Sequence, residues 1–507
     1  MSPTNLLAET WFPTRGLNLL SPSQTIKDMA GEGYDVEFDN GDPLVIRKRD
    51  GYSHVNASAV SATPTLNGLL SLYLSNGTKY ELIVTNGGGV WKSDSASAGA
   101  NVFQTGTFNA SAQPVSFTQF LDVGLFLDGA SSCKSWDGSV TGIVTAVPSG
   151  AKYGELHLNK FCVAGCAGQL STVFYSITGA YNDFTSSGSG SFVVAGNDGS
   201  VIKSLMSFSN NECLIWKNNS MWKVIGTTST DFNLILVDKG TGSVCDRSAQ
   251  NFRGGFAIWA DADGLKVYDG TAPKKISQYI QPFWDTIQKS KFETMDSCID
   301  QNNGLYYLSC STSGSTNNRI IVVDMLHPWQ DETGWHMPIW IWRVSAQSLN
   351  IETLSTGTQM VMGVIGGFKH LFSNATYSDN GTAIEAYVDS PLRTFGDGLA
   401  IDDCLRRVYL PYVNTSGALN IYTEVKDGGD WKLLSTLQTG SVAAQIGIDF
   451  TIGTSAVGAS EITGTQRIDA MARSRRIKLR FYQNSSTDYF KIQAPIEMLY
   501  KAGGTRG

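Results

Sequence analysis

Charged side chains are scarce in this sequence: Asp, Glu, Lys and Arg make up 16% of its 507 residues, against about 25% in ordinary soluble domains. The formal net charge is −7. A protein that wraps DNA or RNA presents a basic surface, because neutralised phosphates supply most of that affinity. The composition therefore argues against tight nucleic-acid binding, although duplex DNA could still slide past an acidic chain.

Long apolar runs are also missing. No stretch of about 18 or more apolar residues occurs, which is the length that a membrane-spanning helix needs. The first sixteen residues lack the basic start and apolar core of a signal peptide. We therefore expect no membrane segment and a protein made in the cytoplasm.

Paired metal ligands are absent as well. Of eight cysteines only Cys162 and Cys166 are close in sequence, and no second pair follows at zinc-finger spacing. The five histidines form neither an HxH nor an HxxxH motif. His327 and His336 flank a tryptophan-rich turn with two carboxylates, which aromatic packing explains better than a metal site. The sequence predicts no metal and no other cofactor.

Catalytic signatures are missing too: there is no GxSxG elbow, no Walker A loop and no dinucleotide fingerprint. Adjacent carboxylates occur at Asp331-Glu332 and Asp402-Asp403, but neighbours on a strand point to opposite faces and do not form an acid–base pair. Carboxylates from separate repeats meeting at one mouth stay open as an alternative. We predict no catalytic residues and no enzymatic activity.

What the sequence does contain is a repeated hairpin: an apolar strand, a tight Gly/Asn/Asp turn, and a second strand that usually carries Trp or Tyr. The hairpins are Glu81–Asp94, Gly124–Ser139, Cys213–Gly226, Phe256–Gly270, Gly304–Asp324 and Met362–Phe372. With a further hairpin starting at Phe161, successive hairpin starts (Leu82, Leu125, Phe161, Leu214, Phe256, Leu305 and Met362) lie 36 to 57 residues apart, close to the about 40–50 residues of a four-stranded propeller blade. The spacing predicts an irregular β-propeller of about six blades, with seven left open.

Three segments follow from this pattern. Residues 1–55 form an N-terminal arm with a small β segment, and residues 56–374 form the propeller. Residues 375–507 show period-two alternation that predicts a separate C-terminal antiparallel β domain. One stretch inside the propeller, Ile276–Lys291, has helical spacing but contains Pro282, so a short or broken helix is expected there. The fold class is all-β.

The tryptophans are the candidate interface residues. Most of them fall at about one per hairpin, as blade-to-blade packing requires. Trp329, Trp335, Trp340 and Trp342 crowd into one short stretch, and the last two share a strand face that leaves apolar area open unless a partner covers it. We expect these four, and Arg15 of the arm, to lie at an interface.

The chain resembles a known family along nearly its whole length. The resemblance is carried by segments of the arm, one hairpin and the closing strands, namely Arg15–Pro22, Val36–Gly41, Ile46–Tyr52, Cys213–Gly226, Ile320–Asp324, Arg475–Phe481 and Phe490–Ile496. These are similar to the tail nozzle, or packaged-DNA stabilisation, proteins of short-tailed phages. No single motif is diagnostic, and the family has no catalytic residues to transfer.

The resemblance implies a structural virion protein of the phage tail, made in the host cytoplasm. Six copies would form a homohexameric ring that extends and closes the DNA channel below the portal. Its partners would be the tail adaptor protein, indirectly the portal, a tail fibre or tailspike, and double-stranded DNA that passes without specific binding. Two other classes stay open: a carbohydrate-binding propeller (a lectin or tail adhesin) and, third, a propeller glycosidase.

Overall fold

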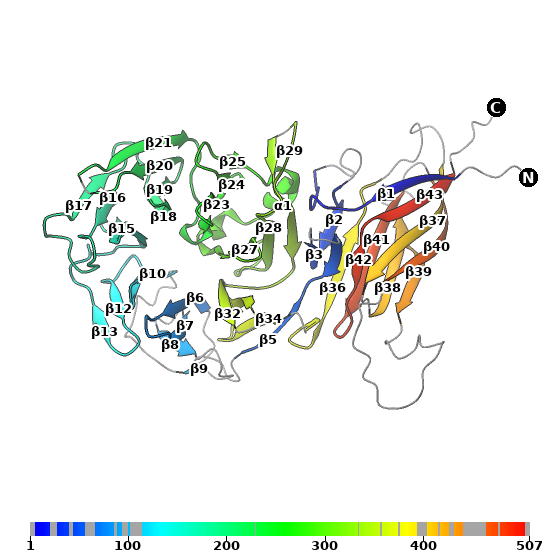
Figure 1. The fold of residues 1–507 in the computed structure, drawn as a ribbon, viewed down its shortest axis with the longest axis horizontal. Helices are drawn as coiled ribbons and strands as arrows, with labels where there is room; N and C mark the ends of the chain where they lie inside the picture. Colours follow the sequence, from blue (N-terminus) through cyan, green and yellow to red (C-terminus); the bar gives the residue numbers. More distant parts are fainter. Residues whose placement is uncertain are drawn as a thin grey trace, which may run out of the picture.

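The structure is a computed structural model that describes residues 6–20, 28–39, 44–55, 66–85, 89–93, 100–101, 114–228, 230–332, 334–354, 357–373, 376–392, 403–413, 416–424, 430–439, 463–474 and 477–501. Strands dominate these residues, and they form a ring of small sheets beside a second β body (Figure 1). Within the described ranges no helix is long and apolar enough to span a bilayer. The predicted all-β class is confirmed.

The ring is a β-propeller with six separate four-stranded antiparallel sheets, here called blades 1 to 6. Blades 1 to 3 consist of β6 (Leu66–Tyr73), β7 (Lys79–Thr85), β8 (Val90–Ser93) and β9 (Ala100–Asn101); β10 (Ser116–Phe120), β11 (Val123–Leu127), β12 (Lys134–Trp136) and β13 (Thr141–Ile143); and β14 (Tyr153–His157), β15 (Lys160–Cys166), β16 (Gln169–Tyr175) and β17 (Gly190–Val193). The predicted propeller of about six blades is confirmed.

Blades 4 to 6 follow in chain order. They consist of β18 (Ile202–Ser209), β19 (Glu212–Lys217), β20 (Ser220–Ile225) and β21 (Asn233–Lys239); β22 (Gln250–Phe252), β23 (Phe256–Asp261), β24 (Gly264–Tyr268) and β25 (Lys274–Lys275); and β26 (Asp296–Asp300), β27 (Leu305–Cys310), β28 (Arg319–Asp324) and β31 (Ile339–Trp342). A hairpin of β29 (Trp329–Asp331) and β30 (Gly334–His336) interrupts blade 6 before β31.

Four further strands, here called the closing sheet, fill the place between blade 6 and blade 1. Three come from the end of the repeat region and one from the N-terminal segment, in the order β32 (Ser348–Leu354), β33 (Gly357–Gly363), β34 (Lys369–Ser373) and β5 (Gly51–His54). Drawing the last strand from the other end of the chain covers a sheet edge that would otherwise stay open. The ring is thereby closed by the N-terminal segment.

Hydrogen bonds cross every junction of this ring. They join Gln119 Nε2 to Tyr73 O, Thr118 Oγ1 to Gly154 O, His157 Nδ1 to Ser207 Oγ, Asn251 Nδ2 to Ser207 O, Gln250 Nε2 to Ser297 O, the Leu349 N–H to Asp296 Oδ2, and Asn350 Nδ2 to Ser71 Oγ, at 2.5 to 3.1 Å. Large rings fill the space between blades: Trp216 of blade 4 lies 5.1 Å from Trp259 of blade 5, centroid to centroid.

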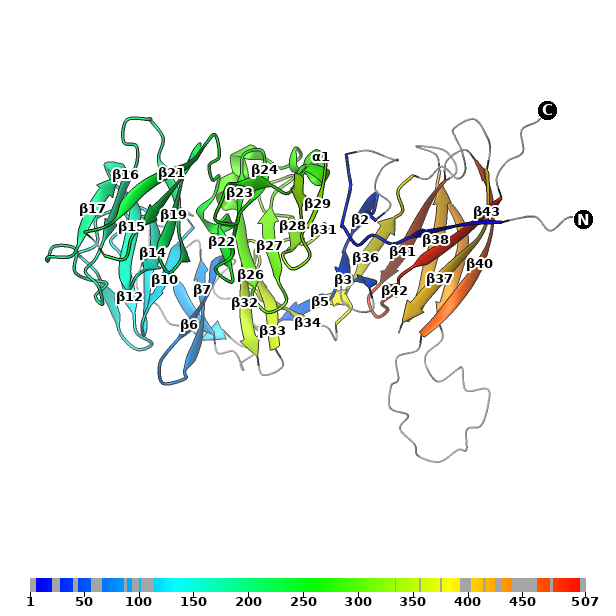
Figure 2. The same ribbon diagram turned by 45° about the horizontal axis from the view of Figure 1, so that its top comes forward.

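The second body is a two-layered antiparallel sandwich (Figure 2). Its first sheet contains β1 (Leu7–Trp11), β43 (Ile496–Lys501), β37 (Asp403–Val413), β42 (Lys491–Gln493), β4 (Val45–Lys48) and β3 (Val36–Asp39), with β40 (Thr463–Ser474) on the other edge of β37. Its second sheet contains β2 (Glu32–Tyr34), β36 (Thr382–Asp389), β41 (Lys478–Ser485), β38 (Gly417–Glu424) and β39 (Lys432–Thr439). Trp11 of the first sheet stacks on Phe481 of the second, which seals the core between them.

The N-terminal segment thus contributes strands to all three assemblies: both sandwich sheets and the propeller. The short strand β35 (Ser378–Asp379) pairs with both β5 and β36, so one path of paired strands runs from the closing sheet into the second sandwich sheet. The propeller and the sandwich are therefore joined by strand pairing as well as by packing.

The expected helical interruption is short. The helix α1 (Gln281–Trp284) has Pro282 in its first turn and lies between two 3₁₀ turns, Gln278–Ile280 and Lys289–Thr294. Ile280, Trp284 and Ile287 are all buried there. Proline is tolerated at the start of a helix because its missing N–H has no intrahelical acceptor in that position.

Candidate functional site

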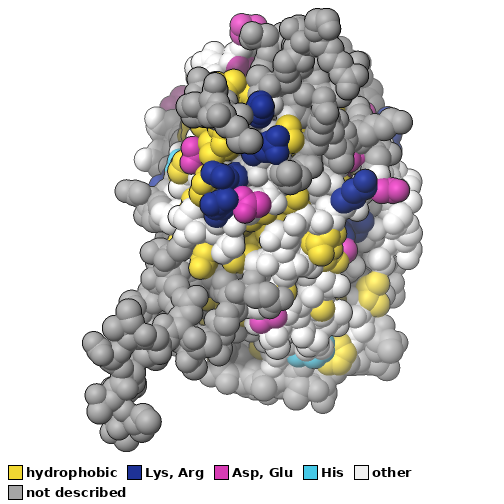
Figure 3. Space-filling view, turned by 90° about the vertical axis from the view of Figure 1, so that its right-hand side faces the viewer, with side chains coloured by type: hydrophobic (Ala, Val, Ile, Leu, Met, Phe, Trp, Pro, Cys, Tyr) yellow, Lys and Arg dark blue, Asp and Glu magenta, His cyan; other side chains and the backbone are white. Residues whose placement is uncertain are grey.

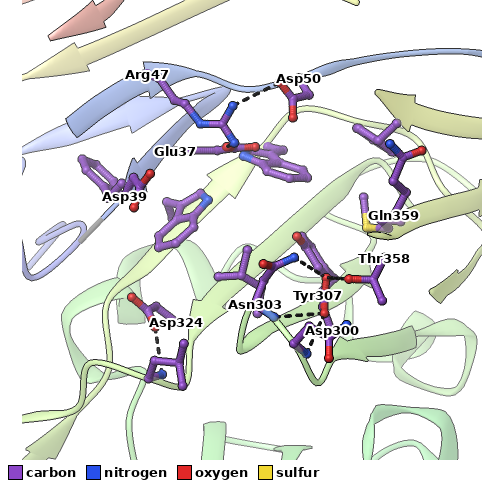
Figure 4. Close-up of a pocket in the computed structure, with 18 of the residues that line it drawn as sticks. Glu37, Asp39, Arg47, Asp50, Asp300, Asn303, Tyr307, Asp324, Thr358 and Gln359 are labelled. Carbon is purple, nitrogen blue, oxygen red and sulfur yellow. Dashed lines mark hydrogen bonds and ion pairs between the residues drawn. The ribbon is translucent and has the colours of Figure 1, made fainter. Parts of the chain in front are cut away.

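A cavity of about 600 Å³ lies where the N-terminal strands meet the propeller (Figure 4). One wall is formed by β3, β4 and the turn after them, and the other by blade 6 and β33 of the closing sheet. Ionisable side chains reach it from both walls, together with Trp340, Trp342 and Phe372. Residues of the N-terminal segment and of the last part of the propeller thus surround one space.

On the N-terminal wall a single guanidinium serves two carboxylates. Arg47 Nη1 lies 3.2 Å from Asp50 Oδ1, and Nη2 forms an ion pair with Glu37. Burial raises the pKa of the Glu37 carboxyl, and the positive charge of Arg47 opposes that shift. Both carboxyl groups on this wall, those of Glu37 and Asp50, are therefore paired with Arg47.

On the propeller wall the carboxylates of Asp300 and Asp324 accept hydrogen bonds from the loops that follow their strands. Asp300 accepts hydrogen bonds from the backbone and side chain of Asn303 and from Thr358 Oγ1, at 2.7 to 3.1 Å. Asp324 accepts from the Leu326 N–H at 2.8 Å, and its other oxygen lies 2.7 Å from His327 Nδ1. These contacts fix the two loops that line the cavity.

The predicted interface residues Trp340 and Trp342 lie on β31 and are only 1% and 3% exposed. Trp340 meets Phe38 edge to face at 5.6 Å, and Trp342 Nε1 donates to Val36 O at 3.1 Å. The cover that these indoles need is supplied by the chain itself, from strand β3 of the N-terminal segment.

The other three predicted interface residues meet at the β29–β30 hairpin. The Arg15 guanidinium lies 4.7 Å above the ring of Trp329, which also stacks against Tyr279. Trp335 packs against Phe256, with the Lys274 ammonium 4.8 Å above its ring. The structure brings Arg15 and Trp329 together, while Trp335 lies on the neighbouring strand; all three remain partly accessible.

A buried ion cluster, here called the clasp, joins the propeller to the sandwich. Arg49 is 1% exposed; its Nε donates to Asp35 at 2.8 Å, and its two terminal nitrogens donate to Asp379 at 2.8 and 2.5 Å. Arg343, directly after β31, donates from Nε to the second oxygen of Asp35 at 2.7 Å and also pairs with Glu385. Asp35 has a φ of 57°, at the point where the chain passes from β2 to β3.

The clasp was not identified from the sequence. Arg49 directly follows Arg47 and Lys48, and nothing in this run of three cations indicates that the last one is buried among carboxylates. Removing the cation of such a cluster strands buried carboxylates and is strongly destabilising.

The propeller tunnel is a second polar region and encloses about 480 Å³. Glu155 of blade 3, Asp246 before blade 5 and Asp296 of blade 6 line it. Burial raises the pKa of these carboxyls, to about 8 for Glu155, about 7 for Asp246 and about 6 for Asp296. Arg247 Nη1 lies 3.3 Å from Asp296, which opposes the shift there. These three acids are far apart in the sequence, so no spacing pattern predicts that they converge.

Most of the described histidines and cysteines are held by packing or by hydrogen bonds within the chain. His336 is buried with Nε2 2.9 Å from Asp331, and His327 pairs with Asp324. Seven of the eight cysteines are buried and all are free thiols. In the part of the chain that the structure describes, no group of three or more His, Cys, Asp or Glu side chains is arranged to hold a metal ion.

No protein-family model and no curated protein matches this chain. Among solved structures, the extracellular domain of a putative one-component system from B. thetaiotaomicron is 11% identical with a TM-score of 0.39, covering 66% of this chain and 41% of its own. The WD40 β-propeller domain of Doa1 is 11% identical with a TM-score of 0.39, covering 64% of this chain and 97% of its own. YCF48 from Cyanidioschyzon merolae is 9% identical with a TM-score of 0.39, covering 64% and 98%.

Proposed function

We propose that this chain is a structural subunit of a phage particle, the tail nozzle, six copies of which form a ring that extends and closes the DNA channel below the portal and adaptor. The observation that carries the proposal is the clasp of Arg49, Asp35, Asp379 and Arg343. Together with the paired-strand path through β35, it joins the propeller and the sandwich into one body. A channel wall that must resist packaged DNA needs a subunit whose parts do not separate.

The path of DNA in this proposal lies between copies rather than through one copy. The propeller tunnel has a volume of about 480 Å³ and is lined by carboxyl groups. A sphere of that volume is roughly 10 Å across, narrower than a single major groove of a DNA duplex, which is about 12 Å wide. The conduit is therefore assigned to the centre of a ring of subunits.

The surfaces available for neighbours have a mixed character. The end of the sandwich shows cationic, anionic and apolar side chains interspersed among uncharged ones (Figure 3). On β37 and β40, for example, Asp469 lies 2.9 Å from Arg467 and 3.5 Å from Arg407. Such a face suits specific contacts between subunits better than tight capture of DNA.

The test is assembly. Electron micrographs of the parent particle are expected to contain six-fold density below the adaptor into which this chain fits, and the purified chain mixed with adaptor protein is expected to form a ring of six. Density of another symmetry at that place, or a chain that stays monomeric with adaptor at micromolar concentration, would contradict the proposal.

The hairpin region gives this test a variant. Arg15→Ser removes the cation over Trp329 at a partly accessible site. The adaptor concentration needed for half-maximal ring assembly is expected to rise at least tenfold. Arg253→Ser at the end of β22 is the matched control, because the Arg253 guanidinium likewise lies above an aromatic ring, 4.8 Å from the centroid of Phe252. Equal assembly of both variants would remove Arg15 from the interface without touching the ring itself.

A second candidate, glycoside hydrolysis, is favoured by one observation: the three tunnel carboxyls have raised pKa values, and a glycosidase acid needs such a shift. Hydrolysis of phage-receptor polysaccharide by the purified chain, lost in Glu155→Gln, would establish it. The lectin alternative gains less, because all twelve tryptophans are buried or half-buried and none is an open platform.

A further inference from the structure

Two histidines face each other across the strand pair that closes the propeller. His54 of β5 and His370 of β34 are direct cross-strand partners. The Val55 N–H donates to Lys369 O at 2.9 Å, so the adjacent His54–His370 pair is a non-hydrogen-bonded one, in which side chains approach most closely. Their ring centroids are 4.4 Å apart, with the ring planes at 63°.

His370 is the unusual member of this pair. It is 6% exposed, and neither ring nitrogen has a hydrogen-bond partner among the described residues. Tyr52 stacks on the ring at 4.7 Å and offers no acceptor or donor in that geometry. Leaving a buried imidazole unsatisfied costs free energy, so the arrangement indicates a ligand for His370 that the protein itself does not provide.

His54 is placed to share that ligand. It is exposed, its ring lies against Phe368 at 4.5 Å, and its Nε2 is 2.7 Å from the side-chain amide of Asn380. The contacting atom is Asn380 Nδ2, which donates to Nε2. A half-turn of the amide group exchanges this nitrogen for the oxygen, so that Asn380 accepts from the Nε2–H and the lone pair of Nδ1 is left for a metal ion. Orientation of a ligating imidazole through its other nitrogen is the usual arrangement at metal sites.

We propose that His54 and His370 chelate one divalent transition-metal ion of the kind that imidazole prefers, Zn²⁺, Ni²⁺ or Cu²⁺, with water completing the coordination. Metal–nitrogen distances of about 2.0 Å place two imidazoles bound at a right angle with centroids roughly 4.5 Å apart, which agrees with the observed 4.4 Å. Imidazole nitrogen suits these ions, whereas Mg²⁺ and Ca²⁺ require oxygen ligands.

The ion would connect the N-terminal strand β5 to the last repeat strand β34. It would therefore fasten the ring at the one place where the two ends of the propeller meet.

The test is metal titration of the full chain after removal of bound metal by a chelator. Isothermal titration with NiCl₂ and ZnCl₂ is expected to give one ion per chain. His54→Gln removes the exposed ligand and is expected to lower the affinity at least tenfold. The control is His327→Gln, which removes another exposed histidine beside a carboxylate and is expected to leave the one-ion stoichiometry intact.

Thermal unfolding supplies a second readout. Metal at 100 times its dissociation constant raises the folding equilibrium constant of the wild-type chain about 100-fold, and so raises its thermal midpoint. His54→Gln should show no comparable rise in its thermal midpoint. Equal binding by wild type and His54→Gln, or no binding to wild type at millimolar metal, would overturn the proposal. If His370→Gln folds poorly, the His54 variant still decides the question, because His54 is exposed.

Discussion

Two junctions of the propeller are built from different chemistry. Between blades 3 and 4 the contact is mainly apolar, with Val173, Leu205, Ile215 and Val224 buried in one cluster. The buried Lys217 of blade 4 pairs there with Asp198 of the connecting segment, whose side chain is 32% exposed. Between the closing sheet and blade 1 a small apolar cluster is joined by buried ions: Lys369 forms an ion pair with Glu352, and Glu81 of blade 1 lies beside them.

The difference follows from how each junction is formed. Blades 3 and 4 are consecutive in the chain, so apolar contact is enough to bring them together. The closing junction joins segments far apart in the sequence: Asn350 and Ser71, which share a hydrogen bond, are 279 residues apart. An apolar surface alone would not fix the register of such segments. Buried ions add little net stability but penalise incorrect pairing strongly.

The largest effect is expected from breaking the ion pair between Lys369 and Glu352 at the closing junction. Lys369→Met leaves Glu352, 4% exposed, as a buried carboxylate without its cation, at a cost of about 3–5 kcal/mol. The double variant Lys369→Met/Glu352→Leu should recover most of that loss, because it removes both charges. Urea unfolding measures both; a single variant as stable as wild type would show that the pair is not effectively buried.

The apolar junction is tested by Ile215→Ala in blade 4. Ile215 is fully buried, and truncation of such a side chain costs about 3 kcal/mol in lost transfer energy and cavity formation. Ile143→Ala on the outer strand of blade 2 is the matched control, since Ile143 is 64% exposed and its truncation should cost less than about 0.5 kcal/mol. Similar losses in the two variants would contradict the assignment of this junction.

The contrast between junctions also marks the limit of sequence-based reasoning. The hairpins could be predicted because strand alternation and turn residues are local, as in Cys213–Gly226, which folds into β19 and β20. The place of β5 in the closing sheet and of β3 against Trp340 could not, because nothing local in Gly51–His54 specifies a partner near residue 370. Trp340 and Trp342 are covered by β3 of the same chain, and nothing local in their own strand specifies that cover.

The propeller tunnel is a third environment for ionisable side chains, because Glu155, Asp246 and Asp296 all line it. Among the described residues, no Lys or Arg forms an ion pair with Glu155. Because the folded pKa of Glu155 is raised to about 8 from an ordinary 4.5, the folded protein holds a proton that the unfolded chain has released. Stability from this group is complete below about pH 4.5 and is lost as the pH rises through 8.

Glu155→Gln should therefore gain on wild type between pH 5 and pH 9 by at least about 1 kcal/mol, since one pKa unit corresponds to about 1.4 kcal/mol. Urea unfolding across that range measures the difference. Glu293→Gln is the control of opposite sign: hydrogen bonds and charge from Lys203 and Lys152 outweigh the opposing desolvation, so the pKa of Glu293 is lowered, and its contribution is lost toward acid pH. A constant offset for Glu155→Gln would show that its carboxyl titrates normally.

The smallest effect is expected where an ion pair is exposed rather than buried. Asp469 is 65% exposed and pairs with Arg467, itself 50% exposed, at 2.9 Å. Water screens both charges, so Asp469→Asn should change the free energy of unfolding by less than about 0.5 kcal/mol, and added salt should reduce even that. Measured beside Lys369→Met at low and high salt, it separates the two kinds of ion pair: a loss near that of Lys369→Met would mean that charge itself, rather than burial at the closing junction, determines the cost.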